Sequence, residues 1–199
     1  MRGWLKRVAA VLSLAMLAAA APQPSDPVVT LHAGLARTFA APGGPSEASI
    51  EALALRTFDM PAITLAVLGD SARTATSAQR ARLTKVLLAR LARQIALSGR
   101  QGAGDAFTVV GTKAAGGADV LVTTREARPA AAGVQPQAVA LAWRVRREGS
   151  RYRIVDSIRD GVSTVGVEHD DFAAQLKGRD VEWVVAHMER LAAAPRPEL

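Results

Sequence analysis

Hydrophobic residues recur every three or four positions through the first half of the chain, a spacing that predicts amphipathic helices. The first predicted helix spans residues 28–39 and ends at a glycine- and proline-rich stretch. A second begins after Ser46, a favourable N-cap, and continues to Phe58. Asp59 is placed to cap a third helix, which Gly69 would end. The first half of the chain is therefore predicted to be helical.

The longest predicted helix begins after Thr76, which forms a capping-box pattern with Gln79. One side of this helix carries a stripe of apolar residues, namely Leu83, Leu87, Leu91 and Ile95. The opposite side carries the basic residues Arg82, Lys85 and Arg93. A basic side of this kind is typical of a solvated surface, and docking to partners or to anionic headgroups is the alternative.

Beyond Gly99 the hydrophobic pattern changes from a helical period to simple alternation, which predicts β-strands. Gly149 marks a tight turn between the last two strands. Because consecutive strands joined by short turns pair with one another, the predicted sheet is antiparallel. The four predicted strands span residues 105–111, 118–126, 137–147 and 151–159.

The order of helices, strands and further helices predicts an α+β fold. We expect helices to gather against one face of a single curved sheet, whose concave side is either filled by large side chains or left as a cavity. The predicted organisation is a flexible leader (21–27) and a single domain (28–199), made of a helical part (28–100), the sheet (105–159) and closing helices (168–193).

The first twenty residues have the pattern of a secretory signal peptide. Arg2, Lys6 and Arg7 precede an uncharged apolar run, and the small residues Ala18 and Ala20 place the cleavage near Ala20. This run is too short to cross a bilayer, which requires about 20 apolar residues. The sequence therefore predicts an exported protein.

Composition narrows the possible functions of the exported chain. The formal charge is +7, and the signal segment holds three of the 25 basic residues and none of the 18 acidic ones, so the mature chain is only mildly basic. Aromatic residues make up 4% of the sequence, too few for a nucleic-acid stacking surface. There is no cysteine, so the fold must be stabilised by its apolar core.

Two residues are the strongest candidates for catalytic chemistry. Asp156 shares a strand face with apolar neighbours, so we expect it to be partly buried and hydrogen-bonded by backbone N–H groups of the turn 160–164. His169 stands beside Asp170 and Asp171, although this acidic cluster is more typical of a helix N-terminus. His32 and His187, the other histidines, are expected to have surface or packing roles.

Several stretches of the sequence resemble one protein family when they are taken together. They are FDMPAI (58–63), VLG (67–69), RTATSAQRARL (73–83) and YRIVDSIRDGVS (152–163), followed by Phe172 and Leu176. Their order and spacing resemble the MlaC, or toluene-tolerance, family of periplasmic phospholipid carriers. The resemblance extends from about residue 46 to residue 191.

The resemblance implies an NTF2-like fold, in which helices close a curved four-stranded sheet around an apolar cavity for acyl chains. It also implies a carrier without a cofactor that moves lipid between an outer-membrane lipoprotein–porin complex and an inner-membrane ABC transporter with an MCE-type subunit. A hopanoid-associated branch shares this framework, so the lipid is a phospholipid or another membrane lipid. The expected lipid-binding residues are Phe58, Val67, Leu87, Leu91, Ile95, Val139, Leu141, Trp143, Ile154, Val162 and Phe172.

Two other classes of function remain compatible with the sequence. One is a small exported enzyme that uses Asp156 or His169 for proton transfer. The other is an interaction module with a filled core, since an apolar helix stripe forms solid core more often than it lines a cavity.

Overall fold

The computed structural model describes residues 21–102, 106–127 and 138–194, so the predicted signal peptide lies outside the described residues. The helices are α1 (Asp26–Ala40), α2 (Glu47–Thr57), α3 (Met60–Leu68), α4 (Ser77–Gly102), α5 (Thr164–Leu176) and α6 (Val181–Ala193), with a 3-10 helix η1 (Gly69–Arg73) after α3. The strands are β1 (Ala106–Ala114), β2 (Asp119–Ala127), β3 (Ala138–Glu148), β4 (Arg151–Arg159) and β5 (Val162–Ser163). No helix in the described part of the chain is long and apolar enough to span a membrane.

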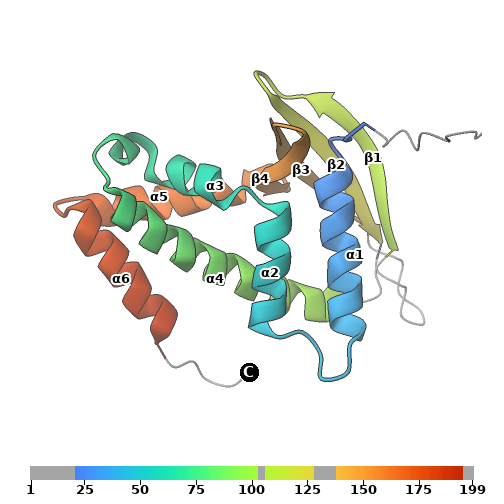
Figure 1. Ribbon diagram of the computed structural model, residues 1–199, viewed down its shortest axis with the longest axis horizontal. Helices are drawn as coiled ribbons and strands as arrows, with labels where there is room; N and C mark the ends of the chain where they lie inside the picture. Colours follow the sequence, from blue (N-terminus) through green and yellow to red (C-terminus); the bar gives the residue numbers. More distant parts are fainter. Residues whose placement is uncertain (1–20, 103–105, 128–137, 195–199) are drawn as a thin grey trace, which may run out of the picture.

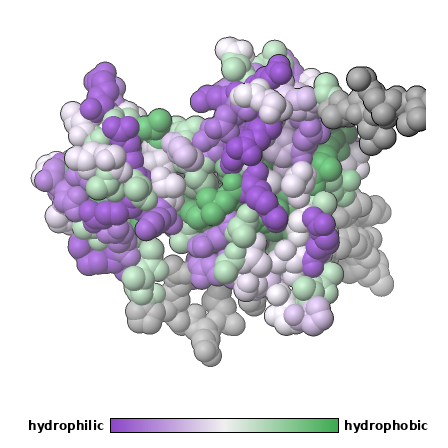
Figure 2. Space-filling model, viewed as in Figure 1, coloured by the Kyte–Doolittle hydropathy of each residue, from purple (hydrophilic) through white to green (hydrophobic). Residues whose placement is uncertain are grey.

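The structure confirms the predicted α+β fold. The strands form one antiparallel sheet in the order β1-β2-β3-β4-β5, and the two-residue β5 extends the four strands expected from the sequence. In Figure 1 the sheet lies at one side of the molecule, and the helical pair α5–α6 extends away from β1 and β2. The surface in the same view is mostly hydrophilic, with small hydrophobic groups near its centre and beside α1 (Figure 2).

Side-chain caps fix the beginnings of α2, α3 and α4, as the sequence predicts. Ser46 Oγ accepts a hydrogen bond from the backbone N–H of Ser49 (3.1 Å), and Asp59 Oδ1 accepts one from Ala62 (3.0 Å). Before α4, Gln79 N–H donates to Thr76 Oγ1 (3.2 Å) while Thr76 N–H donates to Gln79 Oε1 (2.8 Å). These bonds satisfy N–H groups that have no partner within their own helices.

Two helices, α1 and α5, begin earlier than the sequence predicts. α1 starts at Asp26, inside the segment expected to be a flexible leader. α5 starts at Thr164, because Ser163 Oγ accepts a hydrogen bond from Gly166 N–H (2.8 Å) and so caps the helix. The interpretation of the acidic residues around His169 as a helix N-terminus is therefore wrong.

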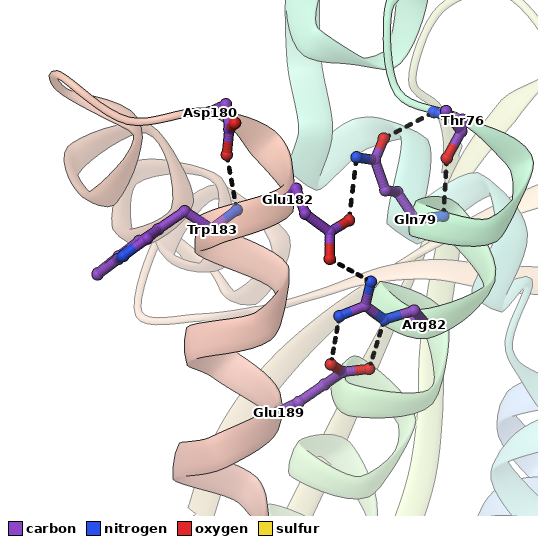
Figure 3. Close-up of polar contacts among 7 residues, drawn as sticks. All are labelled: Thr76, Gln79, Arg82, Asp180, Glu182, Trp183 and Glu189. Carbon is purple, nitrogen blue, oxygen red and sulfur yellow. Dashed lines mark hydrogen bonds and ion pairs between the residues drawn. The ribbon is translucent and has the colours of Figure 1, made fainter.

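Four acidic side chains of α5 and α6 pair with arginines on α4. Arg90 Nη1 lies 2.9 Å from Glu168 Oε2 on α5. Arg82 donates to both carboxylate oxygens of Glu189 (2.9 and 2.6 Å) and to Glu182 (2.6 Å), as Figure 3 shows. These hydrogen bonds hold the pKa values of Glu182 and Glu189 below their usual range. Arg82 thus joins α4 to α6, which corrects the prediction that it lies on a solvated face.

The first half of β4 has a third neighbour besides β3 and β5. Phe58 forms a parallel bridge with Ile154, and Asp59 N–H donates to the carbonyl oxygen of Ile154 (2.8 Å). Further along the strand, Ile158 and Arg159 pair with β5. Two short segments therefore satisfy backbone groups along the outer edge of β4.

The packing of α1 on the sheet centres on His32. Its ring stacks on Phe107 of β1, with a centroid distance of 3.8 Å, and meets the edge of Trp143 of β3 at 5.8 Å. Its Nε2 atom also lies 3.3 Å from Glu126 Oε1. Burial among these groups lowers the pKa of His32 to about 4. The structure thus gives His32 a packing role.

We predict that His32 makes the protein less stable in mild acid. Its pKa is about 4 in the folded chain and about 6.5 in the unfolded chain, so the unfolded chain binds more protons between these values and stability falls as the pH decreases. Between pH 7 and pH 5 the loss in the free energy of unfolding through this group should be about 2 kcal/mol. Urea unfolding at both pH values should show that His32→Leu loses this dependence and that His187→Ala keeps it. Equal pH dependence in wild type and His32→Leu would contradict the assignment.

Gly69 ends α3 in a conformation that brings it against α5. Its φ is +53°, and its backbone N–H donates to carbonyl oxygens of the last turn of α3. His169 of α5 covers this glycine, with Nδ1 3.0 Å from the carbonyl oxygen of Val67. A Cβ atom on Gly69 would lie 2.6 Å from His169 Cε1, so only glycine allows this close approach.

We predict that Gly69→Ala destabilises the fold more than Gly149→Ala does. Both glycines have positive φ, but a Cβ on Gly149 would meet nothing within 4 Å. The control, Gly149→Ala, should lower the free energy of unfolding by about 1 kcal/mol through backbone strain alone. Gly69→Ala should lower it by at least about 1 kcal/mol more, because its Cβ also clashes with His169. Denaturant unfolding would measure both losses. Adding His169→Ala to Gly69→Ala should reduce its excess loss, and similar losses in the two single variants would refute the close-approach explanation.

Candidate functional site

An apolar pocket lies where α3, α4, α5 and the end of β4 meet. Its apolar lining comes from the segment before α3 and from the three helices, and β4, α4 and α5 also contribute polar residues. The pocket is lined by Phe58, Ile63, Leu87, Leu91, Gln94, Asp156, Ser157, Thr164, Val165 and Glu168.

The volume of this pocket is about 40 Å³. Such a space accommodates roughly one water molecule, whereas pockets for small-molecule ligands usually have volumes of roughly 300–1,000 Å³. The structure therefore shows a small apolar pocket where the sequence predicted a cavity for acyl chains, and this pocket is far smaller than such a ligand. A ligand with acyl chains requires these walls to separate.

The residues expected to bind lipid are distributed between the pocket and the core around it. Phe58, Leu87 and Leu91 line the pocket. Five more are buried in the core, namely Val67, Leu141, Trp143, Ile154 and Phe172, and Ile95 and Val139 pack against that core while partly exposed. Val162 is 58% exposed on β5, so the structure places it at the surface, outside the pocket.

Sequence reasoning missed several pocket residues because it placed the start of α5 too late. Thr164 was assigned to a turn and Val165 to no element, although both begin α5 and contribute one wall. The signal that could have located them is Ser163, a favourable N-cap. Ile63 and Gln94 lie on helices that were predicted correctly, but their orientation toward the pocket depends on tertiary packing.

Asp156 connects β4 to the beginning of α5. Its carboxylate accepts hydrogen bonds from Ser163 Oγ (2.6 Å) and from the backbone N–H of Val165 (3.1 Å). The residue is 7% exposed, so the predicted burial is correct, and the backbone donor lies one residue beyond the predicted turn. Because Ser163 also caps α5, Asp156 positions the helix wall of the pocket.

Three further polar residues of the pocket have contacts of their own. Ser157 Oγ and Thr164 Oγ1 share a hydrogen bond of 2.9 Å. Burial raises the pKa of Glu168, although the nearby guanidinium of Arg90 opposes this effect. His169, the other candidate for proton transfer, instead contacts the end of α3. Within the described ranges, no group of three or more His, Asp or Glu residues could hold a metal ion.

Comparison with known proteins identifies the family. The sequence model of the MlaC protein family matches residues 44–190, which is most of the chain. No curated protein matches the sequence. Among solved structures, the phospholipid-binding protein from Ralstonia solanacearum in complex with a phospholipid has a TM-score of 0.71 and 19% identity, covering 85% of this chain and 97% of that one. The structural likeness supports the fold, and the family match shows that this chain belongs to the MlaC family.

Proposed function

We propose that this protein is a periplasmic lipid carrier, which holds the acyl chains of a phospholipid or a related membrane lipid in the pocket between α3, α4, α5 and β4. The observation that carries the proposal is the apolar pocket itself, at the meeting point of these elements. Membership of the MlaC family supports it, as does the shared fold with a phospholipid-binding protein that was solved with its lipid.

A pocket of this kind addresses the main energetic obstacle to lipid transfer. Two acyl chains of about 16 carbons would lose roughly 25 kcal/mol of apolar stabilisation in water, at about 0.8 kcal/mol per methylene. Apolar walls replace most of the contacts that the chains have in a bilayer. Transfer between membrane and protein can then be close to neutral, and therefore reversible.

We further propose that α5 moves away from α4 when lipid enters. Phe172 is the buried residue of α5, so this helix is anchored by little apolar surface. Arg90 of α4, which pairs with Glu168 and Asp171 of α5, has a side chain that is 40% exposed, so water can solvate its guanidinium group when the helices separate.

The proposed route of the carrier follows from the family resemblance. Residues 1–20 would direct export and be removed near Ala20. The mature protein would then exchange lipid with an outer-membrane lipoprotein–porin complex and with an inner-membrane ABC transporter that has an MCE-type subunit. The carrier performs no covalent chemistry in this scheme, and the polar groups of the pocket wall have structural roles.

We predict that the protein purifies with lipid bound, and that filling the pocket prevents this. Val165→Phe places a ring in the pocket, whereas Val162→Phe makes the same change at an exposed position three residues away. Mass spectrometry of denatured samples should detect lipid in wild type and in Val162→Phe. The amount of lipid in Val165→Phe should be at least about tenfold lower, because acyl chains and the ring compete for one space.

Leu91→Trp, on the opposite wall of the pocket, provides a second test if Val165→Phe folds poorly. Circular dichroism would show which variants keep the fold. The proposal fails if wild-type protein from membrane-containing cells holds no lipid, or if folded pocket variants carry as much lipid as Val162→Phe.

We predict that Asp156 is needed for stability and not for chemistry. Asp156→Ala leaves Ser163 Oγ and Val165 N–H without their acceptor, which should lower the free energy of unfolding by about 1–3 kcal/mol. Asp156→Asn should lose less, because its amide oxygen can still accept one hydrogen bond. Denaturant unfolding, combined with Ser163→Ala in a double-mutant cycle, would measure this coupling. If Asp156→Asn kept its stability and its bound lipid but abolished cellular function, the enzyme hypothesis would be favoured instead.

A further inference from the structure

The outward side of α6 differs from the side that faces α4. We call it the outer face of α6 and define it as Lys177, Arg179, Trp183, His187, Arg190 and Leu191. The last four recur at helical spacing, and the first two lie in the turn that leads into the helix. Figure 3 shows Trp183 pointing away from α4, while Glu182 and Glu189 point toward it.

The acidic side chains of α6 and of its N-cap residue all have partners, either on α4 or in the backbone of α6. Glu182 and Glu189 bind Arg82 on α4. Asp180 Oδ1 accepts a hydrogen bond from the backbone N–H of Trp183 (2.7 Å) and so caps the helix. Lys177, Arg179 and Arg190 are exposed and form no ion pair within the described part of the chain. The outer face of α6 therefore presents positive charge that the protein itself does not neutralise.

A partly exposed tryptophan stands among these cations. Trp183 is 36% exposed, and the guanidinium carbon of Arg179 lies 3.7 Å from the centroid of its ring. His187 stacks on the same indole at 4.9 Å. One turn further along, Leu191 is 58% exposed. Tryptophan is suited to the boundary between water and lipid, because its ring is apolar and its N–H is a hydrogen-bond donor.

We propose that the outer face of α6 binds the surface of a lipid bilayer that contains anionic headgroups. The unneutralised cations are complementary to such headgroups, and Trp183 and Leu191 can enter the interfacial region. Two exposed apolar side chains offer little buried area for a stable protein interface, whereas weak and reversible membrane contact needs few groups. This contact is separate from the lipid pocket and does not require bound lipid.

Vesicle binding provides the test. Wild-type protein should bind vesicles of phosphatidylglycerol and phosphatidylcholine at low ionic strength, and bind much less to phosphatidylcholine alone. Each basic residue near an anionic surface changes affinity about fivefold. The triple variant Lys177→Gln/Arg179→Gln/Arg190→Gln should therefore bind about 100-fold more weakly in a sedimentation assay.

The matched control removes the same charge elsewhere. Arg37, Arg56 and Arg159 are exposed residues of α1, α2 and β4. Their triple glutamine variant should bind anionic vesicles within about threefold of wild type, because the contact depends on position and not on net charge. Val165→Phe should also bind like wild type, which separates surface binding from occupation of the pocket.

Tryptophan fluorescence gives a second measurement on the unmodified protein. Trp4 lies in the predicted signal peptide and Trp143 is buried at 8% exposure, so in protein without residues 1–20 an aqueous quencher such as acrylamide acts mainly on Trp183. Anionic vesicles should reduce this quenching to about half, and Trp183→Ala should abolish the change. Equal vesicle binding by the two triple variants would overturn the proposal. A second pair of results would also overturn it: wild-type protein does not bind anionic vesicles, and the α6 triple variant no longer delivers lipid in cells. The outer face of α6 would then contact a protein.

Discussion

The arrangement of the helices depends on α4, which packs into the core with one side and forms ion pairs with α5 and α6 with the other. Its apolar side is buried in the core, where Leu83 and Leu87 are almost inaccessible to solvent. Its polar side holds α5 through Arg90 and α6 through Arg82. Loss of this apolar packing would disrupt the core, whereas loss of the ion pairs would weaken the attachment of α5 and leave α6 held by its own buried residues Val184, Val185 and Met188. The same helix therefore contributes to the core and to the attachment of α5.

This arrangement suits a protein that must be stable and still admit a large apolar ligand. A solid interior gives stability through apolar burial but leaves no space, and a permanent cavity of lipid size would forfeit that burial whenever the lipid is absent. A small pocket that widens when α5 moves, as proposed above, would satisfy both demands. The polar network of Asp156, Ser163 and Val165 ties the beginning of α5 to β4, so α5 would pivot about this end, and Glu168, one turn further along, would move away from α4.

Local signals in the sequence predicted most of the elements. Ser46, Asp59 and the Thr76–Gln79 pair located helix starts correctly, because each cap acts within three residues. The start of α5 was predicted too late because Glu168 and its acidic neighbours resemble a first turn. In the folded chain, Glu168 instead pairs with Arg90, a residue 78 positions earlier that no local pattern connects to it. Pocket residues such as Ile63 were missed for the same reason, since their neighbours are set by packing between distant helices.

The covered edge of β4 affects the tendency of the chain to aggregate while it folds. Exposed strand edges recruit strands from other molecules, including unfolded copies of the same chain. Phe58 and Asp59 occupy one half of this edge and β5 occupies the other. Intermolecular sheet growth from β4 is thereby blocked as soon as the α2–α3 junction docks, so early docking of that junction would protect the protein from aggregation.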